Sequence, residues 1–221
     1  MSAETERHAR EDILGALRRG LAAAPLVVPE PPARPAPEPI TPDPWAKLAE
    51  VLTPLSVPLR LAKNPAEAAA LVTDIARERK ATSYTRWDES LDGLGLDEAL
   101  SGLTRAEAGP CRDLGKIDLG IALAHGVLVE SGTMVLAAGP GRHRAASLLP
   151  PASIILAPRK ALLEDVGRLP ELLAKLTAGG RAPACVNLIS GPSSTADIEL
   201  VLVRGVHGPA SLTIVGLDWD F

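Results

Sequence analysis

Two residues in the C-terminal half of the sequence have side chains suited to moving protons. Glu130 ends an apolar run and precedes a Ser-Gly turn. A carboxylate held partly out of water there has a raised pKa, which suits acid–base catalysis. The alternative is a carboxylate that accepts backbone N–H bonds and fixes the turn. His207 lies in a Gly-Val-His-Gly-Pro corner, as a proton-transfer group or as a hydrogen-bonded strut. Glu130 and His207 are the candidate catalytic residues.

Two further corners carry groups that bind oxygen-rich ligands. Ser131 and Thr133 flank Gly132, and their hydroxyls either bind a substrate oxygen or bond their own turn. A Gly-Pro-Gly-Arg sequence follows, in which Gly141 precedes Arg142. A guanidinium clamps a carboxylate or phosphate through two parallel hydrogen bonds. The alternative here is a solvated basic turn.

A third corner, Gly-Pro-Ser-Ser-Thr, contains Gly191, Ser193, Ser194 and Thr195. It follows an apolar strand, and its hydroxyls with the carboxylates after them predict the start of a helix. The first turn of a helix has free N–H donors and a positive dipole end, so this corner is the best anion site in the chain. Glu199 is expected to point toward the same site. The bound group is expected to be a small carboxylate or phosphate.

Several classes of site and partner are excluded by spacing and composition. The glycine corners match neither nucleotide-binding loop, and no nucleophile elbow is present. The histidines lack metal-ligand spacing, and Cys111 and Cys185 are too few to hold an iron–sulfur cluster or zinc. We therefore expect no metal and no cofactor in this chain. A net charge of −4 and five aromatic residues (three Trp, one Tyr and one Phe) argue against nucleic-acid binding.

The N-terminal region is expected to form an arm separate from the site. Apolar residues at helical spacing predict a helix over 4–23 with a narrow apolar stripe, which docks on the parent domain or on a neighbouring subunit. Residues 25–44 contain nine prolines and predict an extended linker. We divide the chain into an arm, 1–44, and an α/β domain, 45–221. No apolar run is long enough to span a membrane and no signal peptide is apparent, so the protein is expected in the cytoplasm.

The rest of the chain alternates helices and strands, which predicts a mixed, mostly parallel Rossmann-like sheet with helices on both faces. Helices are expected to start at Asp43-Pro44 and at Asn64-Pro65, and a third is expected to start at Ser194 and stop at Gly205. Three glycine corners, at 126–142, 189–199 and 205–209, are expected to lie together at one edge. The predicted strands are 58–62, 82–87, 119–130, 133–138, 152–157, 185–189 and 211–217.

The motifs occur together, in an order that resembles a known family. They are Glu-Ser-Gly-Thr from 130, Gly-Pro-Gly-Arg from 139, Ser-Leu-Leu-Pro-Pro from 147, Gly-Pro-Ser-Ser-Thr-Ala-Asp-Ile-Glu from 191 and Gly-Val-His-Gly-Pro from 205. This set resembles the lactate utilization domain family, in its lactate utilization protein C branch, over residues 45–217. The resemblance implies the fold of ribose-5-phosphate isomerase, glucosamine-6-phosphate deaminase and the CoA transferases.

The resemblance also implies a role in oxidising L-lactate to pyruvate, together with partner proteins that carry iron–sulfur clusters. Two other functions stay open. One is a stand-alone enzyme of the sugar-phosphate isomerase or acyl-transfer type, with Glu130 as general base. The other is a non-catalytic regulatory or scaffold subunit that docks, or forms homo-oligomers, through its N-terminal helix.

Overall fold

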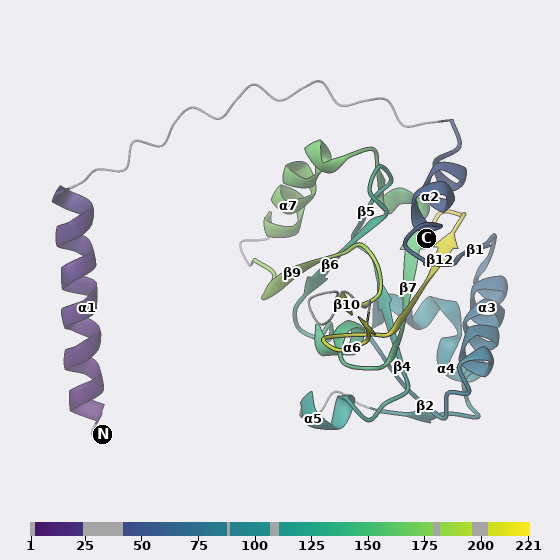
Figure 1. Ribbon diagram of the computed structural model, residues 1–221, viewed down its shortest axis with the longest axis horizontal. Helices are drawn as coiled ribbons and strands as arrows, with labels where there is room; N and C mark the ends of the chain where they lie inside the picture. The colour runs from purple at the N-terminus through teal and green to yellow at the C-terminus, as the bar shows by residue number, and fades with distance from the viewer. Residues whose placement is uncertain (1–2, 24–41, 88, 107–110, 179–181, 196–202) are drawn as a thin grey trace. The chain divides into compact units, whose positions relative to one another are not determined.

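The computed structural model describes residues 3–23, 42–87, 89–106, 111–178, 182–195 and 203–221 (Figure 1). The chain forms two compact units, residues 1–35 and 36–221. The predicted Pro-rich linker lies almost entirely outside the described residues.

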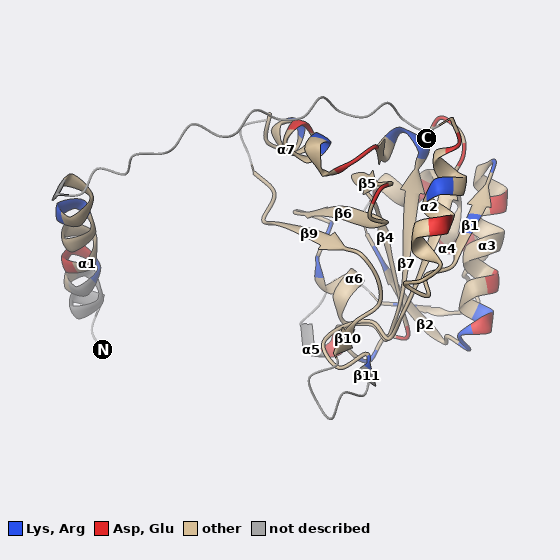
Figure 2. Ribbon diagram, turned by 45° about the horizontal axis from the view of Figure 1, so that its top comes forward, with Lys and Arg blue, Asp and Glu red and all other residues tan. Residues whose placement is uncertain are grey.

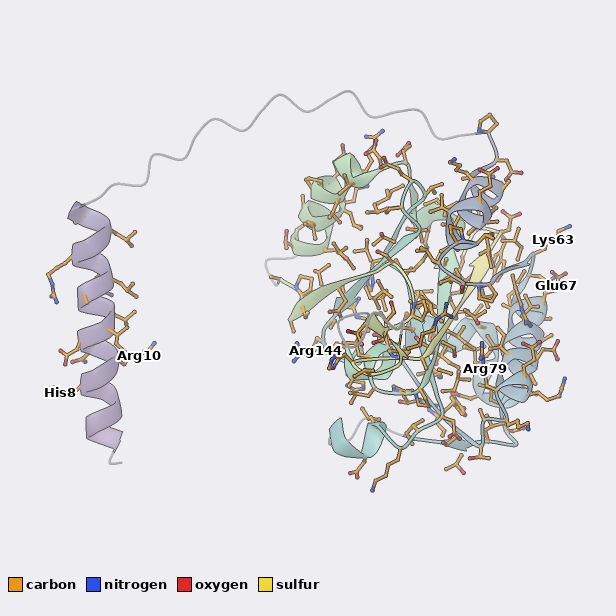
Figure 3. The ribbon with its side chains drawn as sticks, viewed as in Figure 1. His8, Arg10, Lys63, Glu67, Arg79 and Arg144 are labelled. Carbon is orange, nitrogen blue, oxygen red and sulfur yellow. The ribbon has the colours of Figure 1, made fainter. Side chains whose placement is uncertain are left out.

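The first unit contains helix α1 (Ala3–Ala23), as the apolar spacing predicts. The side chains of its apolar stripe are exposed, by 61% at Ile13 and 57% at Leu17. His8 and Arg10 project from the same helix (Figure 3). The helix therefore presents an apolar stripe to its surroundings.

The second unit is built on a six-stranded sheet with strand order β1-β12-β7-β4-β2-β3, and every neighbouring pair in it is parallel. Parallel neighbours need crossover connections, which the intervening helices supply. The predicted α/β class is confirmed. The strands are β1 (Leu59–Ala62), β2 (Ser83–Arg86), β3 (Thr104–Arg105), β4 (Leu119–Leu123), β7 (Ala152–Pro158) and β12 (Ser211–Leu217).

Two helices begin where the sequence predicts. Asp43 accepts a hydrogen bond from the Ala46 N–H (3.0 Å) and starts α2. Asn64 accepts from the Glu67 N–H (2.9 Å) and starts α3, while the Glu67 carboxylate accepts from the Lys63 N–H (2.8 Å; Figure 3). The helices are α2 (Pro44–Leu52), α3 (Pro65–Glu78), α4 (Leu96–Ala99), α5 (Cys111–Leu114), α6 (Ala145–Leu148) and α7 (Leu169–Thr177), with 3-10 turns η1 (Glu89–Leu94), η2 (Arg159–Ala161) and η3 (Val166–Arg168).

Helices cover both faces of the large sheet, as predicted. α3 and α4 lie on one side of it, with acidic and basic residues along the outer surface of α3 (Figures 1 and 2). On the other side, a Cβ added at Gly216 would lie 2.9 Å from the Trp45 ring of α2, and one added at Gly120 would lie 1.8 Å from the Ala146 carbonyl oxygen of α6. Strand β7 is buried at every position, because a parallel sheet covered on both faces leaves no side for water.

A second, four-stranded sheet has the order β8-β5-β6-β9. The predicted hairpin is present, as β5 and β6 pair antiparallel. However, four residues connect them instead of two, and the predicted strand 119–130 is divided between the two sheets. The Ala124 N–H bonds to Leu156 of the large sheet, whereas the His125 N–H bonds to Val135 of the small one (both 2.8 Å). The strands are β5 (Gly126–Leu128), β6 (Thr133–Ala138), β8 (Leu162–Leu163) and β9 (Cys185–Ile189).

The prediction of a helix that starts at Ser194 is wrong for its first residues. Strand β10 (Ser194–Thr195) pairs antiparallel with β11 (Val203–Arg204). A helix start would leave its first backbone N–H groups without hydrogen-bond partners, whereas pairing with β11 supplies partners. The strand is therefore favoured over the helix that the local capping pattern predicts. Gly205 follows β11 with a φ of +82°, so it ends a strand and not a helix. Residues 196–202, including Glu199, lie outside the described residues.

We predict that Gly120→Ala destabilises the second unit strongly. The added Cβ meets a backbone carbonyl of α6, so relief requires moving the helix, at a cost of roughly 3 kcal/mol. Gly102→Ala is the control, because its Cβ has no neighbour within 4 Å. Urea unfolding of both variants measures the difference. Equal stabilities would contradict the close packing of α6 on β4.

Candidate functional site

The candidate site is a cavity of about 260 Å³ on the sheet face that α6 covers. α6 and β10 lie side by side there in both views (Figures 1 and 2). Four serines and one histidine supply its polar groups and leucine side chains supply most of the rest. We call it the serine pocket. Its lining residues are Ser147, Leu148, Ser153, Leu188, Ile189, Ser190, Gly191, Ser193, His207, Gly208, Pro209 and Leu212.

Two of the three predicted corners meet in the serine pocket. The Ser193 N–H donates to the Pro209 carbonyl (2.8 Å), and the Gly205 N–H donates to the Ser193 carbonyl (2.9 Å). The Ser193 hydroxyl accepts from the backbone N–H of His207 (3.2 Å). Gly191, Ser193 and His207 therefore line one cavity, with the His207 side chain exposed. Ser194 and Thr195 lie beside it in β10.

A chain of hydroxyls connects the first corner to the pocket wall. The Ser131 and Thr133 hydroxyl oxygens lie 2.8 Å apart, and Thr133 Oγ1 lies 2.8 Å from Ser190 Oγ. Gly132 has a φ of +66° and packs against α2, since its Cβ would lie 2.9 Å from Leu52. Ser131 and Thr133 thus bond within their own turn, and Thr133 also supports a residue of the pocket.

The structure corrects the expected environment of Glu130. Its side chain is exposed, because β5 ends two residues earlier, at Leu128, and Glu130 stands in the turn. Its backbone N–H donates to the Glu164 carbonyl (3.1 Å), and it does not line the serine pocket. The expectation of a partly desolvated carboxylate is wrong. The catalytic role of Glu130 stays a hypothesis.

Gly141 and Arg142 do not line the serine pocket. Gly139 and Arg142 exchange two backbone hydrogen bonds of 3.0 Å around a tight turn, in which Gly141 has a φ of +70°. Arg142 Nη1 lies 2.8 Å from His125 Nε2. This turn follows the end of β6, whereas Thr133 begins that strand. The expectation that all three corners share one edge is therefore wrong for Gly139–Arg142, because β6 separates this turn from Thr133.

Three of the pocket serines were not predicted from the sequence. The Ser147 hydroxyl donates to the carbonyl of Arg144 (3.0 Å), which precedes α6 (Figure 3). Ser190 is the last residue of the hydroxyl chain, with its Oγ 2.8 Å from Thr133 Oγ1. Ser153 is 3% exposed, and its hydroxyl has no hydrogen-bond partner among the described residues. A lone hydroxyl inside the apolar run of β7 is the signal that could have identified Ser153, since buried polar groups are normally bonded.

A second cavity, of about 460 Å³, is lined by charged side chains around Arg86. Asp97 accepts from the Arg86 Nε (2.8 Å) and from the Tyr84 hydroxyl (2.8 Å), and it pairs with Arg105 (2.5 Å). The hydrogen bond from Arg86 lowers the pKa of Asp97 to about 2. Burial, followed by the bond to Asp97, raises the pKa of Tyr84 to about 12. The charges face one another, so the network serves to hold η1 and α4 against β2.

The part of the chain that the structure describes contains neither a candidate metal site nor a membrane-spanning helix. Within it, no three His, Cys, Asp or Glu side chains are grouped so as to hold a metal ion. None of the described helices combines the length and apolar character needed to cross a membrane. Cys185 is a half-buried free thiol.

The model of the LUD domain family matches residues 46–216. The chain belongs to the LUD domain family. Among curated relatives, the lactate utilization protein C of Halalkalibacterium halodurans is 48% identical over 93 residues, which cover 42% of this chain and 40% of that protein. That of Shouchella clausii is 42% identical over 101 residues, or 46% and 44% of the two chains. Each match thus spans less than half of the relative.

A solved structure is similar to this LUD domain in fold. The crystal structure of a DUF162 family protein from Deinococcus radiodurans superposes with a TM-score of 0.60 and covers 79% of this chain and 96% of that one. The identity is 19%, so the comparison supports the fold of the LUD domain.

We predict that Thr133→Val weakens the domain by about 1 kcal/mol, the usual net contribution of a hydrogen bond. Valine keeps the shape of the buried side chain but breaks the hydroxyl chain to Ser190. Thr104→Val, at an exposed strand position, is the control. Urea unfolding of the two variants tests this, and equal midpoints would show that the chain contributes nothing.

We predict that Asp97→Asn removes a pH-dependent part of the stability. The folded-state pKa of Asp97 is about 2 against an ordinary value of 3.8, so the unfolded chain binds more protons between these values. The contribution of Asp97 to the free energy of unfolding is therefore present above about pH 4 and lost as the pH falls toward 2. Asp97 is 37% exposed, and solvent screening reduces its contribution to roughly 1 kcal/mol.

Urea unfolding at pH 6 and at pH 2.5 measures this contribution. The wild type is expected to exceed Asp97→Asn at pH 6, and the difference is expected to shrink at pH 2.5. Asp74→Asn is the control, because Asp74 forms an exposed pair with Arg77. A difference that is the same at both pH values would contradict the assignment.

Proposed function

We propose that this LUD domain protein acts in lactate utilization, as a subunit of a system that oxidises L-lactate to pyruvate. The relatives named lactate utilization protein C support this role. We place the protein in the cytoplasm, with its partners. The observation that carries the proposal for the site is the serine pocket, since it combines hydroxyl groups with apolar walls in a volume suited to a small carboxylate.

The electrons of the reaction are assigned to partner proteins with iron–sulfur clusters. Such clusters are generally held by four cysteine thiolates, and this chain has two cysteines. In this proposal the chain binds a small carboxylate and the partners supply the redox centres. The chain itself needs no cofactor for that task.

α1 supplies a docking arm in this proposal. Its apolar stripe includes Ile13, Leu14, Leu17 and Leu21, all with exposed side chains. Such a stripe is typical of a helix that packs on a partner. The partner is an iron–sulfur subunit or a second copy of this chain. A scaffold function is thus compatible with the ligand site, whereas an isomerase-type mechanism gains no support from the exposed Glu130.

Reconstitution tests the proposed function. Lactate-dependent dye reduction by the purified iron–sulfur partners is measured with and without this chain, and the rate is expected to fall to background without it. A variant that lacks residues 1–35, the first compact unit, is expected to lose association with the partners while keeping its fold by circular dichroism. Gly102→Ala serves as the folded control. A full rate without the chain would exclude a subunit role.

A further inference from the structure

We propose that Ser153 is the residue at which the serine pocket binds its ligand, and that this ligand is a small monocarboxylate with a short apolar end. This inference rests on the proposed function for its choice of acid. It adds a binding residue and a chemical class of ligand, both argued from the hydrogen-bonding capacity of the pocket.

Ser153 is the polar group of the pocket that most needs a partner. It is 3% exposed, and its hydroxyl is buried with no hydrogen-bond partner in the part of the chain that the structure describes. A buried hydroxyl left without a partner is costly, so such groups are rare unless a ligand or a water completes them. Because Ser153 lines the cavity, a ligand in the cavity can complete it.

The other serines determine which kind of group is accepted. The Ser147 hydroxyl already donates its proton to the Arg144 carbonyl. The Ser193 oxygen already accepts from the His207 N–H, which leaves its own proton free to donate. Ser190 also keeps a proton when Thr133 donates to it. Ser153 and Ser193 are thus two donors, and Ser190 is a third in that arrangement, so the cavity favours a ligand with several acceptor oxygens.

The charge of the lining selects a carboxylate over a phosphate. Among the described residues that line the pocket there is no Lys, Arg, Asp or Glu. A phosphate carries close to two negative charges at neutral pH, and burying it without a cation is unfavourable. A monocarboxylate carries one charge, which hydroxyl donors can bind.

Size and shape agree with a short acid. The volume of about 260 Å³ holds roughly eight groups the size of a water molecule, at about 30 Å³ each. Leu148, Leu188 and Leu212 line the cavity and suit a methyl or short alkyl end. A 2-hydroxy or 2-oxo acid of three or four carbons has this combination of groups.

Ser153 is also held in a fixed position. It lies on β7, where it pairs with Gly120 of β4 and with Leu212 of β12. Central strands position a side chain more accurately than a loop does. The other donors come from the corners at 190–193, so the ligand would connect these corners to the sheet.

Calorimetric titration of the full chain with L-lactate, pyruvate, acetate and inorganic phosphate tests the proposal. The wild type is expected to bind L-lactate or pyruvate more tightly than acetate or phosphate. Ser153→Ala is expected to weaken that binding at least about tenfold, as for the loss of a hydrogen bond to a charged group. Ser153→Cys keeps the size and weakens the donor, so its affinity is expected to lie between the two.

Ser83→Ala is the matched control, because Ser83 does not line the serine pocket, and thermal unfolding without ligand separates the two serines. Ser83→Ala loses an internal hydrogen bond to Asp118, so its melting temperature is expected to fall while acid binding stays unchanged. Ser153→Ala loses no internal hydrogen bond, so its melting temperature is expected to hold or rise.

Three outcomes would overturn the inference. They are no binding of any of the acids by the wild type, equal binding by Ser153→Ala, and tighter binding of phosphate than of the acids. Each leaves the reconstitution result untouched. A chain that the partners require but that binds no acid at Ser153 would keep the proposed function and lose this assignment.

Discussion

The structure depends on one change of hydrogen-bonding partner between Ala124 and His125. The Ala124 N–H bonds to Leu156 and keeps the chain in the large sheet, whereas the His125 N–H bonds to Val135 and starts the small one. Buried backbone groups need hydrogen-bond partners, and these two consecutive residues find theirs on strands of different sheets. The hairpin of β5 and β6 therefore leaves the large sheet, and β9 pairs with β6. The end of β9 then comes close to β7 and forms a wall of the serine pocket.

The charged cavity and the serine pocket differ in their chemistry. A cluster of ion pairs lies beside β2, where Arg86 and Arg105 meet Asp97. The serine pocket has hydroxyls and leucines instead. Oppositely charged side chains that already pair with one another leave little for a ligand to gain. A buried hydroxyl without a hydrogen-bond partner is stabilised when a ligand supplies that partner. The neutral pocket is for this reason the better candidate site, although the charged cavity is larger.

The candidate site was predictable in part. The corners at 191–193 and 205–209 are recognisable because glycine, proline and serine mark turns by their local chemistry, and the structure brings them together through Ser193. Arg142 fits a binding role equally well by residue type, yet it lies beyond the far end of β6. Residue type indicates what a side chain can bind. It carries no information on which strand lies between two corners.

The sequence alone determined what depends on neighbours along the chain: the caps of α2 and α3, the limits of β12, the alternation of helices and strands and the motif set of the family. Tertiary structure decided the rest. Ser194 and Thr195 form a strand because 203–204 pairs with them. Glu130 is exposed because β5 ends at Leu128. Ser153 is significant only because α6, β9 and the corner at 205–209 enclose its hydroxyl. Each of these depends on backbone pairing between distant segments, which no local pattern specifies.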